Sequence, residues 1–232
     1  PIDALLERLA GVSTLCFFEL QRYHRILEHA ESGSLYMNMG ISYVRLDSLG
    51  KAKYYFLKAS DYPVAQSRAE EALSYVNQRF SRQSAVLPPL PWQQYFDWLE
   101  DTAGYRAITK IGFILLNLGI LLVLVYWNWN RVASRRWFKY ISLTIAGLGL
   151  LGLAHGAYLS YQGDRYHKAV MIQQQQQVYE QPNAESGVVS MSYEGYTFRV
   201  DLSRGAERNG WHYVRLSNGL YGWIPAEDIL IL

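Results

Sequence analysis

The residues of this chain that could perform chemistry are few and far apart. None of the five histidines has the spacing of a metal-ligand pair, and no serine or cysteine stands in a nucleophile motif. No pair of carboxylates suggests general acid–base chemistry. We therefore predict that the protein is not an enzyme, and that it uses no metal, cofactor or small-molecule substrate. The histidines are His24, His29, His155, His167 and His212.

Two sequence features could be mistaken for reactive or ligand-binding sites. Cys16 is the single cysteine, so an internal disulfide is excluded, and its apolar neighbours favour a buried structural thiol over a reactive one. Gly147, Gly149 and Gly152 have the spacing of a dinucleotide-binding loop, but no strand precedes them. The formal charge of +2, with no large basic patch, argues against a nucleic-acid partner.

The elements that position everything else are two apolar runs, residues 111–129 and 140–161, within the region 108–161. Each run is close to the roughly 20 residues that a helix needs to cross a bilayer. Backbone polar groups in lipid must be satisfied within their own segment, so the runs are predicted to be helices. Together they predict a two-helix transmembrane hairpin with a different domain on each arm.

The loop between the runs, residues 130–139, carries four basic residues and no acid. Short loops of this kind stay in the cytoplasm, so both arms and both termini are expected in the periplasm of a bacterial inner (cytoplasmic) membrane. The chain begins at Pro1 rather than Met, which fits either a removed signal peptide or a fragment.

Four residues inside the runs are expected to govern helix packing. Asn117 and His155 lie equally far from the outer ends of their runs, which predicts an interhelical hydrogen bond. The alternative for His155 is pH sensing or ligand binding. Gly152 and Gly156 are predicted to let another helix approach closely, either the first run or a helix of a partner protein.

Residues 1–83 have helical spacing throughout and predict an all-α arm. Two helices are expected before residue 30, and a helix over 64–83 is expected to close the stack. Between them, the order of seven residues resembles the tetratricopeptide repeat. These residues are Tyr36, Met39, Gly40, Tyr43, Ala52, Phe56 and Ala59.

Such a repeat presents a concave groove, which predicts a partner-binding face on the first helix of the repeat. Asn38 and Arg45 are its better candidates for outside contact. The alternative for the apolar residues Met37, Ile41 and Val44 is packing against the neighbouring repeat. The predicted groove residues are Ser34, Met37, Asn38, Ile41 and Arg45, with Val44 nearby.

Residues 84–107 are predicted to form a linker followed by a short amphipathic helix. The proline-rich stretch 86–91 favours a stiff, extended spacer, and Pro91 suits the first turn of a helix. On that helix Trp92, Tyr95, Phe96 and Leu99 share one face. This face is expected to lie in the outer membrane interface; the alternative is docking onto the last helix of the first arm.

After the hairpin the periodicity changes to two, and residues 169–232 predict a small all-β arm. Strands are expected at 178–180, 196–200, 211–216 and 221–224, and the glutamine run 173–177 is expected to carry no chemistry. Asn218-Gly219 predicts a tight hairpin turn, because both residues tolerate positive φ. Short strands at this density favour a closed barrel.

The stretch 210–225, from Gly210-Trp211 to Gly222-Trp223-Ile224-Pro225, resembles the bacterial SH3-like signature. Its aromatic residues could line a peptide groove or fill a very small core, and core filling is preferred for Trp223. The predicted groove consists of Tyr196, Trp211, Tyr213, Tyr221 and Trp223.

The order of these parts resembles the BatE family, the tetratricopeptide proteins of the bacterial aerotolerance operon. The resemblance rests on a repeat arm, the linker Leu87-Pro88-Pro89-Leu90-Pro91-Trp92, a two-span hairpin and a terminal SH3-like domain. It covers nearly the whole chain and departs from the family in its degenerate first repeat. It implies action beside von Willebrand factor A-type membrane proteins and a MoxR-type ATPase, with a link to oxygen tolerance or envelope stress.

Two functions therefore follow from the sequence. The first is a non-enzymatic scaffold or adaptor whose two arms bind partner proteins at the membrane. The second is an envelope sensor or cell-wall binder, in which the SH3-like domain recognises a peptide or peptidoglycan.

Overall fold

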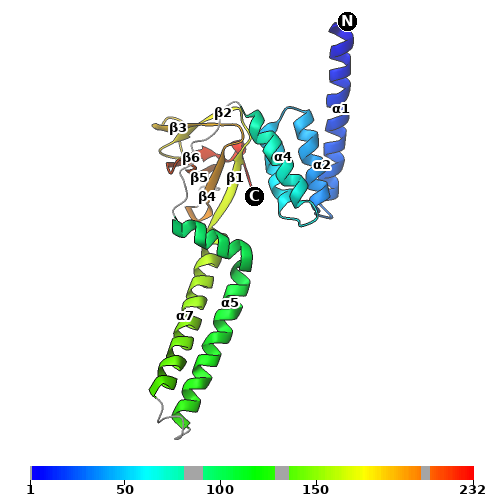
Figure 1. Cartoon of the computed structure of the whole chain (residues 1–232). Helices are drawn as coiled ribbons and strands as arrows, with labels where there is room; N and C mark the ends of the chain where they lie inside the picture. Colours follow the sequence, from blue (N-terminus) through cyan, green and yellow to red (C-terminus); the bar gives the residue numbers. More distant parts are fainter. Residues whose placement is uncertain (1, 81–90, 129–135, 205–209) are drawn as a thin grey trace. The chain divides into compact units, whose positions relative to one another are not determined.

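The computed structural model of the protein describes residues 2–80, 91–128, 136–204 and 210–232. The chain divides into two units (Figure 1). One unit joins residues Pro1–Leu87 with Tyr166–Leu232, and the other is Pro88–Arg165. We call the helices before residue 81 the helical arm and the strands after residue 165 the β domain. The two predicted arms thus belong to a single unit.

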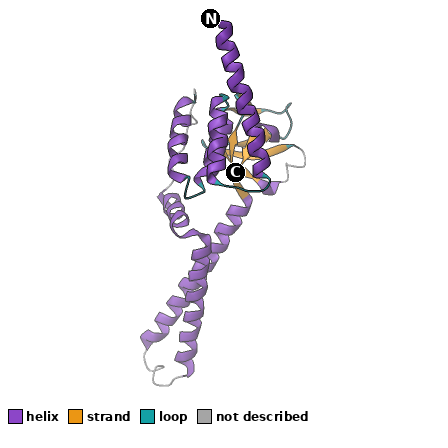
Figure 2. Ribbon diagram, turned by 90° about the vertical axis from the view of Figure 1, so that its right-hand side faces the viewer, coloured by secondary structure: helices purple, strands orange, loops and turns teal. Residues whose placement is uncertain are grey.

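The helical arm contains α1 (Ile2–Leu27), α2 (Gly33–Arg45), α3 (Leu49–Ser60) and α4 (Gln66–Arg79) (Figure 2). The prediction of two helices before residue 30 is wrong, because α1 runs through both. No proline interrupts that stretch, and a lone glycine such as Gly11 is tolerated inside a helix. The predicted last helix is present as α4.

Helices α2 and α3 cross closely because a small residue stands at the crossing. A Cβ added to Gly40 would collide with the ring of Phe56. Ala52 and Ala59 are fully buried on α3, and Tyr36 and Met39 are buried on α2. One apolar cluster therefore fills the helical arm, to which α1 contributes Leu20 and α4 contributes Ala69 and Val76.

The ends of α2 are fixed by local hydrogen bonds. The Ser32 side chain accepts the backbone N–H of Leu35 at 3.2 Å, as an N-cap does. At the other end Ser48 N–H donates to Tyr43 C=O at 3.0 Å, and Asp47 N–H donates to Val44 C=O at 3.1 Å. Asp47 has a φ of 56°, so the turn into α3 is a Schellman motif with an aspartate where glycine is usual.

Replacing Asp47 by glycine is expected to raise the free energy of unfolding of the full-length chain by about 0.5–1 kcal/mol, because the left-handed conformation is costly for a residue with a Cβ. Asp61→Gly is the matched control, since Asp61 ends α3 with a φ of −71° and glycine gains nothing there. Chemical denaturation of both variants checks the prediction. Equal effects would contradict it.

The second unit contains the long helices α5 (Pro91–Asn128) and α7 (Arg136–Arg165). Within them, the stretches Arg106–Asn128 and Trp137–Gly163 are long and apolar enough to cross a membrane. Only 11% and 17% of these stretches are buried, whereas a core helix of a soluble protein is mostly buried. Large apolar side chains such as Ile114 (64% exposed) and Leu151 (67% exposed) face outward, as lipid-facing residues do.

The predicted short helix after Pro91 is not a separate element. The helix that begins at Pro91 continues without a break into the first apolar stretch, and Figure 1 shows it changing direction on the way. The side chains of residues 92–99, which carry the predicted aromatic face, lie outside the described side chains. The linker at 81–90 and the basic loop at 129–135 lie outside the described residues.

The β domain is one antiparallel sheet with the strand order β3-β2-β6-β5-β4-β1-β7. The strands predicted at 196–200, 211–216 and 221–224 are present within one residue at either end. The sheet begins at residue 166, three residues before the predicted start of the β arm, and the strand predicted at 178–180 is β2, which begins inside the glutamine run. The strands are β1 (Tyr166–Met171), β2 (Gln175–Tyr179), β3 (Val188–Tyr193), β4 (Thr197–Asp201), β5 (Trp211–Leu216), β6 (Tyr221–Pro225) and β7 (Ile229–Ile231).

A single apolar cluster lies inside the β domain. It includes Val178 on β2 and Ile229 on β7, near opposite ends of the strand order. The sheet must curl for these side chains to meet. Ladder pairing between β3 and β7 is not found in the described residues, so a closed barrel of the SH3-like kind stays a prediction.

The turn at Asn218-Gly219 is a hairpin, but with three loop residues rather than two. Leu216 N–H donates to Leu220 C=O at 2.9 Å, and Gly219 N–H donates to Leu216 C=O at 3.0 Å. Only Gly219 has positive φ, at 86°. The Asn218 side chain instead accepts the N–H of Leu220 at 3.2 Å, which makes asparagine useful there without a left-handed backbone.

Candidate interaction surfaces

An aromatic face lies on the outer side of strands β2, β5 and β6. Side chains alternate along β5, so that Val214 is buried while Trp211 and Tyr213 point outward. The ring of Tyr213 lies 5.1 Å from that of Trp223 and 6.0 Å from that of Tyr221. We define the aromatic face as Tyr179, Trp211, Tyr213, Tyr221 and Trp223, with Tyr179 meeting Trp211 at 5.5 Å between ring centroids.

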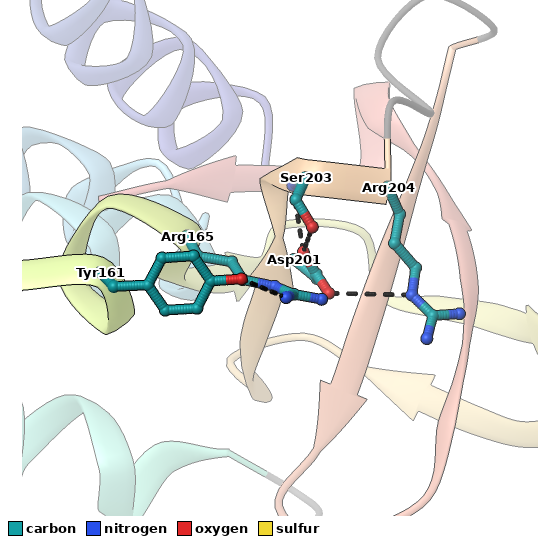
Figure 3. A network of polar contacts seen from close by, with 5 residues as sticks. All are labelled: Tyr161, Arg165, Asp201, Ser203 and Arg204. Carbon is teal, nitrogen blue, oxygen red and sulfur yellow. Dashed lines mark hydrogen bonds and ion pairs between the residues drawn. The ribbon is translucent and has the colours of Figure 1, made fainter. Parts of the chain in front are cut away.

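Two arginines lie over this face. The guanidinium of Arg204 is 4.1 Å from the centroid of the Tyr213 ring, and that of Arg215 is 5.5 Å from the centroid of the Tyr221 ring. Arg204 is also 3.7 Å from the carboxylate of Asp201, which accepts a 2.6 Å hydrogen bond from Ser203 (Figure 3). Aromatic rings with planar cations suit extended peptides that carry acidic or carbonyl groups.

The structure separates the predicted groove residues of the β domain. Trp211, Tyr213, Tyr221 and Trp223 lie together on the aromatic face. The preferred prediction that Trp223 fills the core is wrong, because its neighbour Ile224 is the inward, fully buried residue. Tyr196 is placed differently: it is partly buried against the inner cluster and pairs with Tyr193 at 5.6 Å between ring centroids.

The predicted groove of the helical arm is smaller than expected. Ser34, Asn38 and Arg45 are exposed along one side of α2. Met37 is only 4% exposed and belongs to the core, so its assignment to a partner-binding groove is wrong. Ile41, with its neighbour Val44, also packs partly buried against that core, which agrees with the packing alternative.

A tyrosine cluster inside the helical arm was not found from the sequence. Tyr55 on α3 stacks on Tyr43 with ring centroids 5.3 Å apart, and on its other side it meets Tyr36 at 6.3 Å. Its hydroxyl lies 3.3 Å from Nε2 of His24 on α1. Burial raises the pKa of both Tyr43 and Tyr55, so these phenols stay neutral. The cluster ties α1, α2 and α3 together.

The helical arm and the β domain meet where α3 begins, in what we call the junction. Ser48 makes no side-chain cap at this helix end. The N–H of Gly50 donates instead to the carboxylate of Glu194, at 2.7 Å. Glu194 lies in the turn between β3 and β4, so the β domain supplies both an acceptor and a negative charge at a helix N-terminus.

Lys53 completes the junction one helical turn further along α3. Its Nζ donates to the carbonyl of Gly195 at 2.7 Å and lies 5.6 Å from the ring centroid of Phe80. Burial lowers the pKa of Lys53, as expected of a cation enclosed between two elements. Gly50 itself leaves no room: an added Cβ would lie 2.5 Å from the carbonyl oxygen of Met171.

Glu194→Ala is expected to lower the free energy of unfolding of the full-length chain by about 1–2 kcal/mol, because it removes a charged acceptor from a helix N-terminus. Glu185→Ala is the matched control, since Glu185 is exposed in the loop between β2 and β3. Chemical denaturation in detergent measures both. If the two variants lose the same stability, Glu194 does not cap α3.

The two long helices pack through glycines. An added Cβ at Gly152 would lie 3.0 Å from the Cα of Gly112, and one at Gly156 would collide with the Thr109 side chain. Gly149 faces the Leu116 backbone just as closely. Of the two alternatives for Gly152 and Gly156, the first is therefore found: the helix that approaches them is α5.

The same contacts set the register and overturn the predicted hydrogen bond between Asn117 and His155. Residues 112 and 116 of α5 lie opposite 152–153 and 149 of α7, which offsets Asn117 and His155 by about 10 Å along the axis. The Asn117 amide donates to Phe113 C=O at 2.8 Å, within its own helix. Ser142 and Thr144 do likewise, at 2.7 and 2.9 Å, as polar side chains do in apolar surroundings.

Among the described residues, no group of three or more His, Cys, Asp or Glu side chains lies close enough to hold a metal ion. Cys16 is 3% exposed on α1, where burial leaves a thiol inert.

The fold and these surfaces define a class of protein: a helical arm joined to an antiparallel β domain, with two helices able to span a membrane. Compared with known proteins, the chain matches no family model. No curated protein matches it either. Assignment to the BatE family therefore stays a prediction from the order of its parts.

Proposed function

We propose that the protein is a non-enzymatic adaptor of the bacterial inner membrane, held there by α5 and α7, whose periplasmic unit binds partner proteins. The observation that carries the proposal is the aromatic face with its two arginines. Aromatic and arginine side chains dominate the energetics of protein–protein interfaces. On this small sheet the large aromatic side chains point outward, while smaller residues such as Val214 and Ile224 fill the core.

The junction supports one part of the proposed topology. The hydrogen bond between Gly50 and Glu194 joins residues on either side of the two spans. Such a contact requires both arms to lie on the same side of the membrane, as they do when a chain crosses twice. In this proposal, the helical arm and the β domain bind partner proteins as one unit and not as two independent domains.

The partners we propose follow from the resemblance to the BatE family: von Willebrand factor A-type membrane proteins, together with a MoxR-type ATPase system. A role in aerotolerance or envelope stress belongs to the same proposal. In addition to the aromatic face, the exposed residues Ser34, Asn38 and Arg45 on α2 offer these partners a second contact surface.

Co-purification of the full-length protein with a von Willebrand factor A-type membrane protein tests the proposal. Tyr213→Ala removes the residue at the centre of the aromatic face, and we expect it to abolish recovery of the partner. Tyr75→Ala is the matched control, because Tyr75 is an exposed tyrosine (52%) on α4. Equal recovery with both variants would exclude the aromatic face.

The proposed topology is tested by labelling with a membrane-impermeant thiol reagent. In a Cys16→Ser background, single cysteines are placed at residue 134, between the spans, and at Asn218, in the exposed β5–β6 turn. After permeabilisation of the outer membrane, labelling at 218 but not at 134 is expected. The reverse pattern would place both arms in the cytoplasm.

The second candidate function is an envelope sensor or a cell-wall binder that acts through the β domain. The aromatic face also suits a peptide stem, because extended chains lie well across aromatic rings. Retention of the full-length protein on purified sacculi, lost in Tyr213→Ala and kept in Tyr75→Ala, would favour this function over protein binding.

A further inference from the structure

We propose that the groove between α5 and α7 at their periplasmic end binds one anionic phospholipid. The inference rests on the proposed membrane location. It adds a ligand site at a place where neither arm takes part.

The groove has an apolar wall. It encloses about 960 Å³ and is bordered by Phe113, Ile114, Leu153 and Ala157. Its volume lies within the range of about 300–1,000 Å³ that is usual for ligand-binding cavities. Gly156 lets the helices approach at this level and adds no side chain of its own. These are the features that an acyl chain needs.

One end of the groove is cationic. Arg106 and Lys110 lie one helical turn apart on α5 and border the groove together with Thr109 and Ser160. The described residues that border it include two bases and no carboxylate. Two cations at the rim complement a phosphodiester headgroup.

The order of these residues along the helix matches the order of groups in a lipid. Arg106 and Lys110 come first, and Phe113 and Ile114 follow about one turn deeper into the apolar stretch. On α7 the same level carries Tyr158 and Tyr161, both more than half exposed, as aromatic residues at a membrane interface are. A bound phosphate at this level would stay in the headgroup region while its chain entered the groove.

The opposite end of the hairpin provides a comparison within the same unit. Lys139 borders a second cavity there, together with Val123, Tyr126 and Leu143 among others. That cavity measures about 190 Å³, and Lys139 is the one cation among the described residues that border it. It is too small for an acyl chain by the same measure, so Lys139 serves as a charge control.

Native mass spectrometry of the full-length protein tests the proposal. The detergent-solubilised protein is titrated with phosphatidylglycerol or phosphatidylcholine of identical acyl chains. We expect preferential retention of one phosphatidylglycerol. Each cation near an anionic lipid headgroup contributes a roughly fivefold gain, so Arg106→Gln/Lys110→Gln is expected to weaken phosphatidylglycerol binding about thirtyfold. Phosphatidylcholine has the same phosphodiester but no net charge, so its binding is expected to weaken much less.

Two further variants keep the test decisive. Lys139→Gln removes a cation elsewhere on the hairpin and should change nothing. Ala157→Phe fills the groove without altering its charge and should reduce retention of both lipids. Equal retention of the two lipids by the unchanged protein would overturn the proposal, as would an effect of Lys139→Gln equal to that of the double variant.

Failure of this inference can be distinguished from failure of the proposed function. If thiol labelling supports two spans and the lipid preference is absent, only the lipid site is lost. If labelling contradicts the spans, the membrane adaptor is lost with it. Circular dichroism of each variant serves as the control that the helices are retained.

Discussion

Gly195→Ala is expected to lower the free energy of unfolding of the full-length chain by about 2–4 kcal/mol. Gly195 has a φ of 80°, a conformation that costs a residue with a Cβ about 1–2 kcal/mol. The added methyl group would also collide with the ring of Phe80, and overpacking of this kind costs about 1–3 kcal/mol. Urea denaturation in detergent, followed by tryptophan fluorescence of the β domain, measures the loss.

Gly210→Ala separates the two causes. Gly210 has a φ of 71°, but no atom of the described residues lies within 4 Å of the position of its missing Cβ. It should therefore show only the backbone cost, about 1–2 kcal/mol. A second check is Phe80→Ala, which should restore part of the stability of the Gly195→Ala chain. If Gly195→Ala costs no more than Gly210→Ala, then Phe80 does not pack against the β3–β4 turn.

Gly149→Leu is expected to force α5 and α7 apart, with a loss of about 3 kcal/mol in the stability of the hairpin. The leucine side chain would meet the backbone of Leu116, and no change of rotamer relieves a collision between a Cβ and a backbone. Close approach at small residues is the main source of helix association in an apolar solvent. Unfolding in sodium dodecyl sulfate, followed by tryptophan fluorescence, measures the change.

Gly147→Leu is the matched control for this experiment. It lies two residues away on the same helix, and in the part of the chain that the structure describes no atom lies within 4 Å of its added Cβ. The same substitution should there leave the stability within about 0.5 kcal/mol of that of the unchanged chain. Leucine forms helices better than glycine does, so helix propensity cannot cause a loss at either position. A loss as large as that of Gly149→Leu would therefore mean that contact with α5 is not what makes Gly149 sensitive.

The elements that local sequence predicts best are those whose contacts are local. Gly40 and Ala52 are small because α2 and α3 cross within one helical hairpin, and their spacing is visible in a short window. Strands β5 and β6 alternate between an aromatic outer face and a buried inner face, so their bounds could be predicted almost to the residue. In these cases the periodicity of the sequence reflects the packing directly, because the residues that pack together are close in the chain.

Other elements have no such pattern. Strand β1 follows α7 directly at Tyr166, and Ala169, Val170 and Met171 are all buried, because both faces of the strand are covered and α3 contacts it. A strand that is buried on both faces shows no alternation of apolar and polar residues, so this pattern could not predict β1. Three of the five residues of β2 are glutamines. Of these, Gln176 donates to Asp228 at 2.6 Å, a contact between residues far apart in the chain.

Counting residues from the ends of an apolar run was a poor measure of depth. The two runs do not start and stop at the same level, and the glycine contacts decide the register. Asn117 was therefore given a partner about two turns from its own level. Likewise, Glu194 could not be linked to α3 from sequence, although an uncapped helix start followed by Gly50 leaves a backbone donor that needs an acceptor.

Glu194, which accepts the hydrogen bond at the start of α3, is synthesised long after that helix. Gly50 and Glu194 are separated by 144 residues, and a ribosome needs about 7–30 s to add that many. In the topology that we propose, both apolar stretches emerge and enter the bilayer during this interval, while the helical arm still lacks the carboxylate that caps α3. We therefore expect the newly made arm to be at its least stable while the hairpin is inserted, and a chain that stalls before residue 194 to carry an arm that proteases cleave readily.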